Sequence, residues 1–200
     1  MLVVTGLLAA ALLASAPAPP PPDLVDVAAL VPDAVLDLRY ASDQNVAGRA
    51  LYPVARCLLL RGVAARLASA ARRLRGQGLR LVLWDCYRPA SAQAELWRAH
   101  PRPGSVTDPA RGSHHSRGAA VDLSLAGAAG EPLPMPTDHD AFGPRARADA
   151  AEGIPEAARR RRDQLRVAME AEGFKANPRE WWHFAAREAA RYPVLDEPLR

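Results

Sequence analysis

Histidine and aspartate occur at a metal-binding spacing in the segment Ser-His-His-Ser-Arg-Gly-Ala-Ala-Val-Asp, which runs from Ser113 to Asp122. Asp122 lies on a run of small residues, seven positions after the loop histidine His115. An imidazole nitrogen and a carboxylate oxygen are ligands that Zn²⁺ accepts, and Gly118 allows the backbone to fold back between them. A polar loop in which Asp122 caps a turn would explain the same residues, so the spacing alone leaves both interpretations open.

A second segment, Glu-Trp-Trp-His at 180–183, offers the groups that a catalytic zinc site still needs. These are a third protein ligand, for which His183 is the candidate, and a carboxylate that takes a proton from water, for which Glu180 is the candidate. Residues three apart in a regular strand point to opposite faces. We therefore expect Glu180 on the preceding turn, with a strand that begins near Trp181. An aromatic core strand with a hydrogen-bonded histidine is the alternative interpretation.

Arg88 lies in the segment Trp-Asp-Cys-Tyr-Arg-Pro at 84–89, at the end of an apolar run that is typical of a core strand. Between Tyr87 and Pro89, its guanidinium could present a fixed positive charge to a cleft and stabilise negative charge that develops there. A structural ion pair is the alternative interpretation of the same arginine.

The elements that must position these residues are predicted from hydrophobic periodicity and from glycine and proline signals. A spacing of three to four between apolar residues predicts helices, and apolar or aromatic runs predict strands. The expected fold class is α+β, a small and mostly antiparallel sheet flanked by helices. The predicted helices cover about 56–74, 91–99 and 155–172, the predicted strands cover 79–87, 119–125 and 181–185, and 100–117 is predicted to be irregular.

Composition and charge describe one globular domain. The chain has 200 residues, of which 49% are hydrophobic and 24% are charged, and this excludes disorder, collagen and coiled coil as overall descriptions. Its 26 basic residues include a single lysine, Lys175, and the net charge is +4. Because the arginines are scattered and do not alternate with stacking aromatic residues, we expect no nucleic-acid partner.

Residues 1–22 carry no charged side chain and differ in composition from the rest of the chain. Leu2–Ala14 is an apolar stretch whose length suits a signal peptide and is short for a membrane span, and five prolines follow at 17–22. We therefore expect an exported protein, periplasmic or extracellular, with one domain over 23–200 and no stable membrane span. One alternative is that the segment is an uncleaved anchor. The other is that the start is mis-assigned, and in that case the protein would be cytoplasmic.

Four motifs, taken in order, resemble those of the VanX-type D-alanyl-D-alanine dipeptidases. This is a family of zinc peptidases related to the D,D-carboxypeptidases that trim peptidoglycan. The resemblance implies a single zinc-peptidase domain that hydrolyses a small D,D-dipeptide, and it leaves the oligomeric state open. The motifs are Asp37–Asn45 with Gly48 and Tyr52, Trp84–Pro89, Ser113–Asp122, and Glu180–His183.

The resemblance implies a role for each residue at a matching position. His115, Asp122 and His183 would bind one zinc ion per chain. Glu180 would be the general base that acts on the zinc-bound water, and Arg88 would stabilise the oxyanion. The chemistry implied is zinc-dependent hydrolysis of D-alanyl-D-alanine.

The substrate-binding segment of the family is matched less closely. In the family, an aspartate that ends a Met-Gly-Thr-x-Phe-Asp segment receives the free ammonium of the substrate, and 135–140 reads Met-Pro-Thr-Asp-His-Asp here. Asp140 is therefore the candidate for this role, with Asp138 as a second carboxylate close by and His139 in place of phenylalanine. Ser113 is the candidate for the carboxylate end of the substrate.

Two other functions fit the same residues. A peptidoglycan D,D- or L,D-carboxypeptidase needs the same zinc site in a more open cleft. A non-catalytic cell-wall binding domain could keep zinc for stability alone. Because zinc retention requires neither Glu180 nor Arg88, the presence of both residues argues against the binding domain.

Cys57 and Cys86 are the two cysteines of the chain. In an exported protein they could form a disulfide between the first long helix and the strand before Arg88, and two buried thiols are the alternative. Neither cysteine is expected to bind zinc, because three other ligands are already assigned. His114, which lies beside the motif's histidine position, is not expected to bind zinc either.

Overall fold

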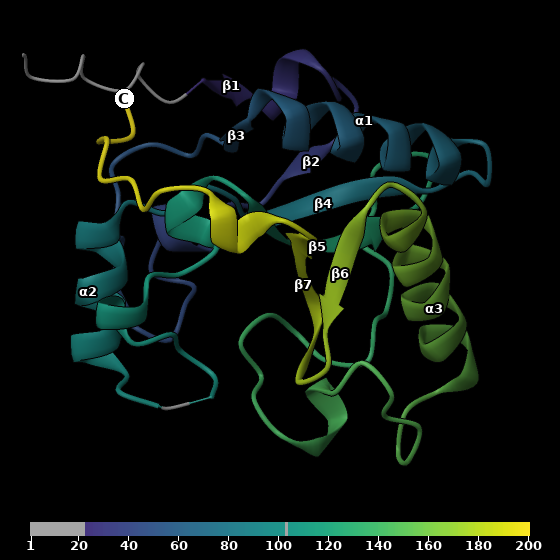
Figure 1. Cartoon of the computed structure of the whole chain (residues 1–200). Helices are drawn as coiled ribbons and strands as arrows, with labels where there is room; N and C mark the ends of the chain where they lie inside the picture. The colour runs from purple at the N-terminus through teal and green to yellow at the C-terminus, as the bar shows by residue number, and fades with distance from the viewer. Residues whose placement is uncertain (1–22, 103) are drawn as a thin grey trace, which may run out of the picture.

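The computed structural model of the chain describes residues 23–102 and 104–200. The apolar segment and the proline tract at 1–22, on which the expectation of a signal peptide rests, lie outside the described residues. The described part confirms the predicted α+β class, with helices packed around a small central sheet (Figure 1).

The central sheet has five strands in the order β2-β4-β5-β7-β6. The pair β2 and β4 is parallel, and the other three neighbouring pairs are antiparallel, as predicted for a mostly antiparallel sheet. The five strands are β2 (Val35–Leu36), β4 (Arg80–Asp85), β5 (Ala120–Ala126), β7 (Glu180–Ala186) and β6 (Phe174–Asn177). A separate two-stranded sheet pairs β1 (Leu24–Asp26) with β3 (Leu58–Leu60).

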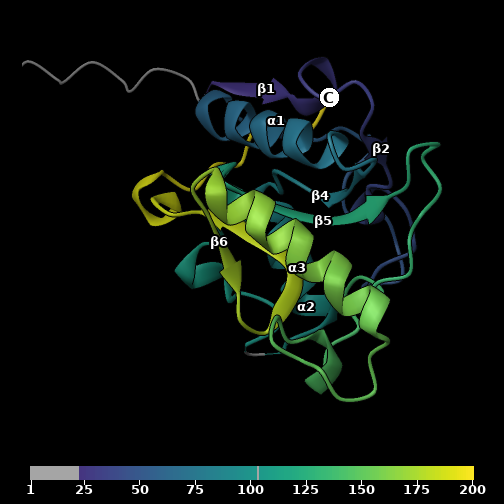
Figure 2. The same ribbon diagram turned by 90° about the vertical axis from the view of Figure 1, so that its right-hand side faces the viewer.

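Two long helices, α1 (Arg61–Arg75) and α3 (Glu156–Ala171), pack against each other and against the central sheet (Figure 2). The shorter α2 (Ala90–Ala99) lies on the other side of β7 from α3 (Figure 1). Helix α1 forms because its apolar residues recur every three to four positions, which places them on one face. The buried residues of α1 are Val63, Ala64, Leu67, Ala68, Ala70, Ala71 and Leu74. Within the described part of the chain, no helix is long and apolar enough to cross a membrane.

The predicted helix over 56–74 starts too early. The helix begins at Arg61, because Leu58–Leu60 is extended and pairs with β1. The amide of Leu60 also donates to the carbonyl of Gly118 at 2.9 Å. These partners are distant in the sequence, so the local spacing of apolar residues could not reveal them.

The predicted position of Glu180 on a turn is wrong, because Glu180 is the first residue of β7. It pairs with Asn177 of β6, and the register of this hairpin shifts between Ala176 and Asn177. A shift of this kind re-aims the side chains around it. Glu180 and His183 therefore line the same cavity although they are three residues apart.

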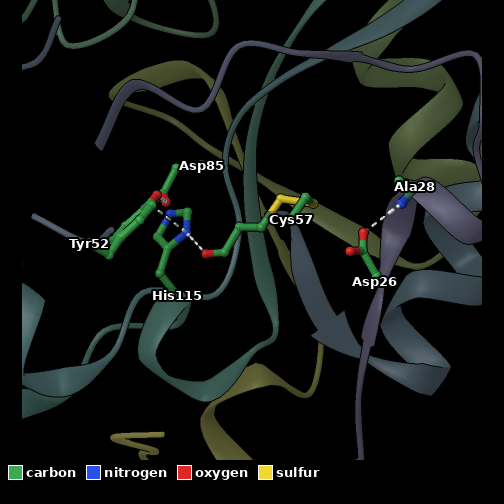
Figure 3. The surroundings of a disulfide bond; sticks show 7 residues. Asp26, Ala28, Tyr52, Cys57, Asp85 and His115 are labelled. Carbon is green, nitrogen blue, oxygen red and sulfur yellow. Dashed lines mark hydrogen bonds and ion pairs between the residues drawn. A yellow bond between two sulfur atoms is a disulfide. The ribbon is translucent and has the colours of Figure 1, made fainter. Parts of the chain in front are cut away.

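Cys57 and Cys86 form a disulfide, with their Cα atoms 5.1 Å apart, and the chain has no free cysteine. Cys57 precedes β3 and Cys86 follows β4, so the bridge joins the two sheets close to Arg88 and not, as expected, the first long helix to a strand. Figure 3 shows that this bridge lies beside His115 and Asp85. The disulfide therefore ties the scaffold together next to candidate site residues.

Candidate active site

His115, Asp122 and His183 come from different elements and converge at one point. His115 begins a short 3₁₀ turn (His115–Arg117), and Asp122 of β5 pairs directly with His183 of β7. Nδ1 of His183 lies 2.9 Å from Oδ1 of Asp122 and 3.1 Å from Nε2 of His115. Nε2 of His115 lies 3.3 Å from the same Oδ1.

These three distances fit a tetrahedral metal site. A zinc ion bound at about 2.0–2.1 Å to nitrogen and oxygen separates neighbouring ligand atoms by about 3.3 Å. The two nitrogens and one oxygen already lie close to this separation. The donor set could therefore hold a divalent metal ion and would leave one tetrahedral position for water or substrate.

Hydrogen bonding fixes which nitrogen of His115 faces this point. Nδ1 lies 2.8 Å from the backbone carbonyl of Cys86, which can only accept a hydrogen bond (Figure 3). Nδ1 therefore carries the proton, and the lone pair of Nε2 is free to bind a metal. Since Cys86 is in the disulfide, the bridge anchors the carbonyl that orients this ligand.

Asp85 is a fully buried carboxylate that organises the arginine of the site. It accepts hydrogen bonds from Nε and Nη2 of Arg88 at 3.0 and 2.6 Å, and from the hydroxyl of Tyr52 at 2.8 Å. It also lies 3.2 Å from Nδ1 of His115. One buried carboxylate therefore holds the arginine and also lies against a candidate metal ligand.

Arg88 forms a structural ion pair with Asp85, and it also lines the cavity. Burial disfavours its charged form, but the neighbouring Asp85, Tyr40 and Asp122 together outweigh burial and raise the pKa of Arg88 above its usual value. Its Nη1 donates to Gln93 at 2.7 Å, and its guanidinium stacks on Tyr40 at 4.5 Å. Because a guanidinium has five N–H groups and three bond to Asp85 and Gln93, two are left for a ligand.

Glu180 lies at the wall of the same cavity and is 8% exposed. Burial raises the pKa of Glu180 from 4.5 to about 7. Its Oε2 accepts a hydrogen bond from the side-chain amide of Asn177 at 2.7 Å, which fixes the carboxylate. A carboxyl group with a pKa close to neutral can both accept and release a proton at neutral pH.

The seven residues predicted from the sequence all line one cavity of about 800 Å³. Ser113 is buried there, and its hydroxyl accepts a hydrogen bond from the amide of His115 at 3.2 Å. Asp140 has a φ of 55°, an uncommon conformation for a residue other than glycine. Its Oδ2 accepts a hydrogen bond from the hydroxyl of Tyr40 at 2.7 Å.

The structure separates the two candidate aspartates of the segment 135–140. Asp140 lines the cavity, whereas the exposed side chain of Asp138 points towards Arg39 at 3.5 Å. His114 is exposed and is not one of the three converging ligands.

Sequence reasoning missed three buried groups of the site. Asp85 lies inside the arginine motif and Tyr40 inside the N-terminal motif, but nothing in their spacing indicates the hydrogen bonds that they make. His139 was noted only as a replacement of phenylalanine. Its Nε2 lies 3.2 Å from Oδ2 of Asp122.

The site gathers the groups that a metal-dependent hydrolytic enzyme needs. Comparison with known proteins shows that the chain belongs to the peptidase class. Residues 22–198 match the family described as D-ala-D-ala dipeptidase. The chain is 42% identical over 173 residues to the D-alanyl-D-alanine dipeptidase of Escherichia coli. The aligned region covers 86% of this chain and 89% of that protein.

Enzymes of the same name from two enterococci are also similar. The one from Enterococcus faecium is 35% identical over 189 residues, with 82% of this chain and 92% of that protein covered. The one from Enterococcus faecalis is 32% identical over 183 residues, with 81% and 86% covered. The chain therefore belongs to the D-Ala-D-Ala dipeptidase family and is a peptidase, as the four motifs indicated.

Proposed function

We propose that this protein hydrolyses the free dipeptide D-alanyl-D-alanine and that it uses one zinc ion per chain. The observation that carries the proposal is the convergence of His115, Asp122 and His183 at separations of 2.9 to 3.3 Å, beside a buried glutamate and a buried arginine. The names of the relatives support the choice of substrate.

His115, Asp122 and His183 would hold the zinc ion, which when bound lowers the pKa of a coordinated water to about 7 and polarises the scissile carbonyl. Glu180 takes a proton from the attacking water and gives it to the nitrogen of the departing D-alanine. In the metal-free protein, burial raises the pKa of Glu180 to about 7, which makes it a stronger proton acceptor than an exposed glutamate.

Arg88 stabilises the oxyanion that forms on the carbonyl under attack. Its ion pair with Asp85 fixes the guanidinium before the substrate arrives, so little reorganisation is needed during the reaction. A single preorganised donor of this kind contributes about 3 kcal/mol to transition-state stabilisation.

Asp140 and Ser113 select the two ends of the dipeptide. Asp140, held by Tyr40, pairs with the free ammonium, and Ser113 binds near the terminal carboxylate. A dipeptide carries both charges at a fixed separation, so Asp140 and Ser113, which line the same cavity, would discriminate against longer or blocked peptides.

A carboxypeptidase that acts on peptidoglycan stems is the second candidate. The cavity of about 800 Å³ adjoins a pocket of about 350 Å³, and both are lined by Phe142 and Glu180, so there is room for a longer chain. A non-catalytic cell-wall binding domain is the third candidate, and the burial of both Glu180 and Arg88 at the cavity argues against it.

One experiment separates these candidates. The zinc-loaded protein is incubated with free D-Ala-D-Ala and, separately, with a stem pentapeptide that ends in D-Ala-D-Ala, and the products are separated by chromatography. We expect D-alanine from the dipeptide alone. Release from the pentapeptide alone would establish the carboxypeptidase, and no release from either would leave the binding domain.

Variants at Glu180 test its assignment as general base. Glu180→Gln should keep one zinc per chain by metal analysis and lose hydrolysis by at least about 100-fold. Glu152→Gln, the same change at an exposed glutamate, is the matched control and should behave as wild type. Loss of zinc together with surviving activity in Glu180→Gln would show that the assignment is wrong.

We also propose that the protein acts outside the cytoplasm. Disulfides persist in oxidising compartments, and the bridge between Cys57 and Cys86 supports this location, as does the apolar stretch within 1–22. Cell fractionation with N-terminal sequencing tests it. We expect a chain shortened by about the length of a signal peptide in the exported fraction. A full-length cytoplasmic protein with free thiols would contradict the proposal.

A further inference from the structure

His139 is a buried histidine to which the proposed mechanism gives no role. Its side chain is 1% exposed and lies among aromatic rings. The ring centroids are 5.4 Å from Trp84, 5.7 Å from Tyr40 and 5.9 Å from Trp182. The related motif has phenylalanine at this position, which suits such surroundings. The imidazole differs from a phenyl ring here in its two nitrogen atoms.

The two carboxylate oxygens of Asp122 have different neighbours. Oδ1 faces His115 and His183 at 3.3 and 2.9 Å. Oδ2 lies 3.2 Å from Nε2 of His139. An ionised carboxylate only accepts hydrogen bonds, so Nε2 of His139 carries the proton and donates it.

The other ring nitrogen of His139, Nδ1, makes no stabilising hydrogen bond among the described residues. Nδ1 is buried, has no hydrogen-bond partner within residues 23–102 and 104–200, and lies 3.6 Å from Oδ2 of Asp140. A buried polar atom without a partner costs folding free energy, and phenylalanine would avoid this cost. Packing alone therefore does not favour histidine at this position.

We infer that His139 is a positioning residue for Asp122. By holding Oδ2, it fixes the plane of the carboxylate and leaves Oδ1 as the single oxygen directed at the metal. The inference rests on the metal site of the proposed function and adds a hydrogen-bond partner outside the ligands. Partners of this kind contribute about 10- to 100-fold to metal affinity.

Three variants test the inference through zinc affinity, measured by competition with a chromophoric chelator. His139→Phe keeps the ring and removes the donor, so we expect its zinc dissociation constant to rise by about 10- to 100-fold. The unfolding temperature of its metal-free form is measured alongside, because the variant loses both the unpaired Nδ1 and the donor to Asp122. His139→Gln places an amide near the position of Nε2 and should restore most of the affinity. His100→Phe, the same change outside the cavity, should bind zinc as wild type does.

Equal zinc affinity in wild type and His139→Phe would overturn the inference and leave the proposed function standing. A wild-type chain that binds no zinc would overturn both. If circular dichroism shows that His139→Phe does not fold, His139→Gln is compared with His139→Asn, whose shorter side chain does not reach Asp122. Weaker binding by the Asn variant is then expected, and equal binding by the two would overturn the inference.

Discussion

Glu180 is buried at the cost of stability, and replacing it should make the metal-free protein more stable at neutral pH. Its side chain is 8% exposed, and burial raises its pKa from 4.5 to about 7. Glu180→Gln keeps the size of the side chain and an oxygen that can accept from Asn177, but it cannot ionise.

The magnitude follows from linkage between protonation and folding. Between pH 4.5 and about 7 the folded protein keeps a proton that the unfolded chain loses, so stability falls as the pH rises through this window. At about 1.4 kcal/mol per pKa unit, the cost of the ionised carboxylate reaches about 3 kcal/mol above pH 7. The variant lacks this cost. It should exceed wild type by up to about 3 kcal/mol at pH 8 and differ little near pH 4.5.

Urea unfolding of both proteins between about pH 4.5 and 8.5 measures this difference. The disulfide is kept oxidised and metal is removed, because a bound cation would itself lower the pKa of Glu180. All other titrating groups are shared, so the difference between the two curves isolates Glu180. A difference that does not change with pH, or a wild type that is more stable than the variant at pH 8, would refute the reasoning.

Arg88→Ala should lower kcat for D-Ala-D-Ala by about 100- to 1,000-fold with zinc content unchanged, and an unchanged kcat would exclude the oxyanion role. Asp140→Asn should raise KM for the dipeptide far more than Asp138→Asn does, because only Asp140 lines the cavity, and equal effects would show that the ammonium site is elsewhere. Replacing Cys57 and Cys86 together by alanine should lower the free energy of unfolding in urea by about 3–4 kcal/mol, the loop-closure value for residues 29 apart. A loss below about 1 kcal/mol would mean that the disulfide contributes little to the free energy of unfolding.

Two of the three candidate metal ligands were predictable from a local pattern. His115 and Asp122 lie within one short segment, and the turn at Gly118 with the small residues after it brings the loop back along β5. Asp122 then pairs with His183 across neighbouring strands. This pairing joins residues 61 positions apart, so it was expected only because the four motifs resemble those of a known family.

The groups that support the ligands were not predictable in the same way. Asp85 accepts hydrogen bonds from Tyr52 and Arg88 and lies against His115, and two of these three residues are about thirty positions away. The strand Leu58–Leu60 likewise depends on distant pairing with β1. Sequence patterns describe a residue's own neighbourhood, whereas these roles arise only when remote segments meet in the core.

Release of D-alanine from free D-Ala-D-Ala by the purified chain, before and after chelation, tests the central claim most directly. We predict two D-alanine molecules per dipeptide, loss of release when a chelator removes the metal, and recovery when one equivalent of zinc is returned. We also predict that Glu180→Gln retains the zinc but releases D-alanine at least about 100-fold more slowly. Hydrolysis that survives full removal of the metal, or that continues at the wild-type rate in Glu180→Gln, would contradict the account.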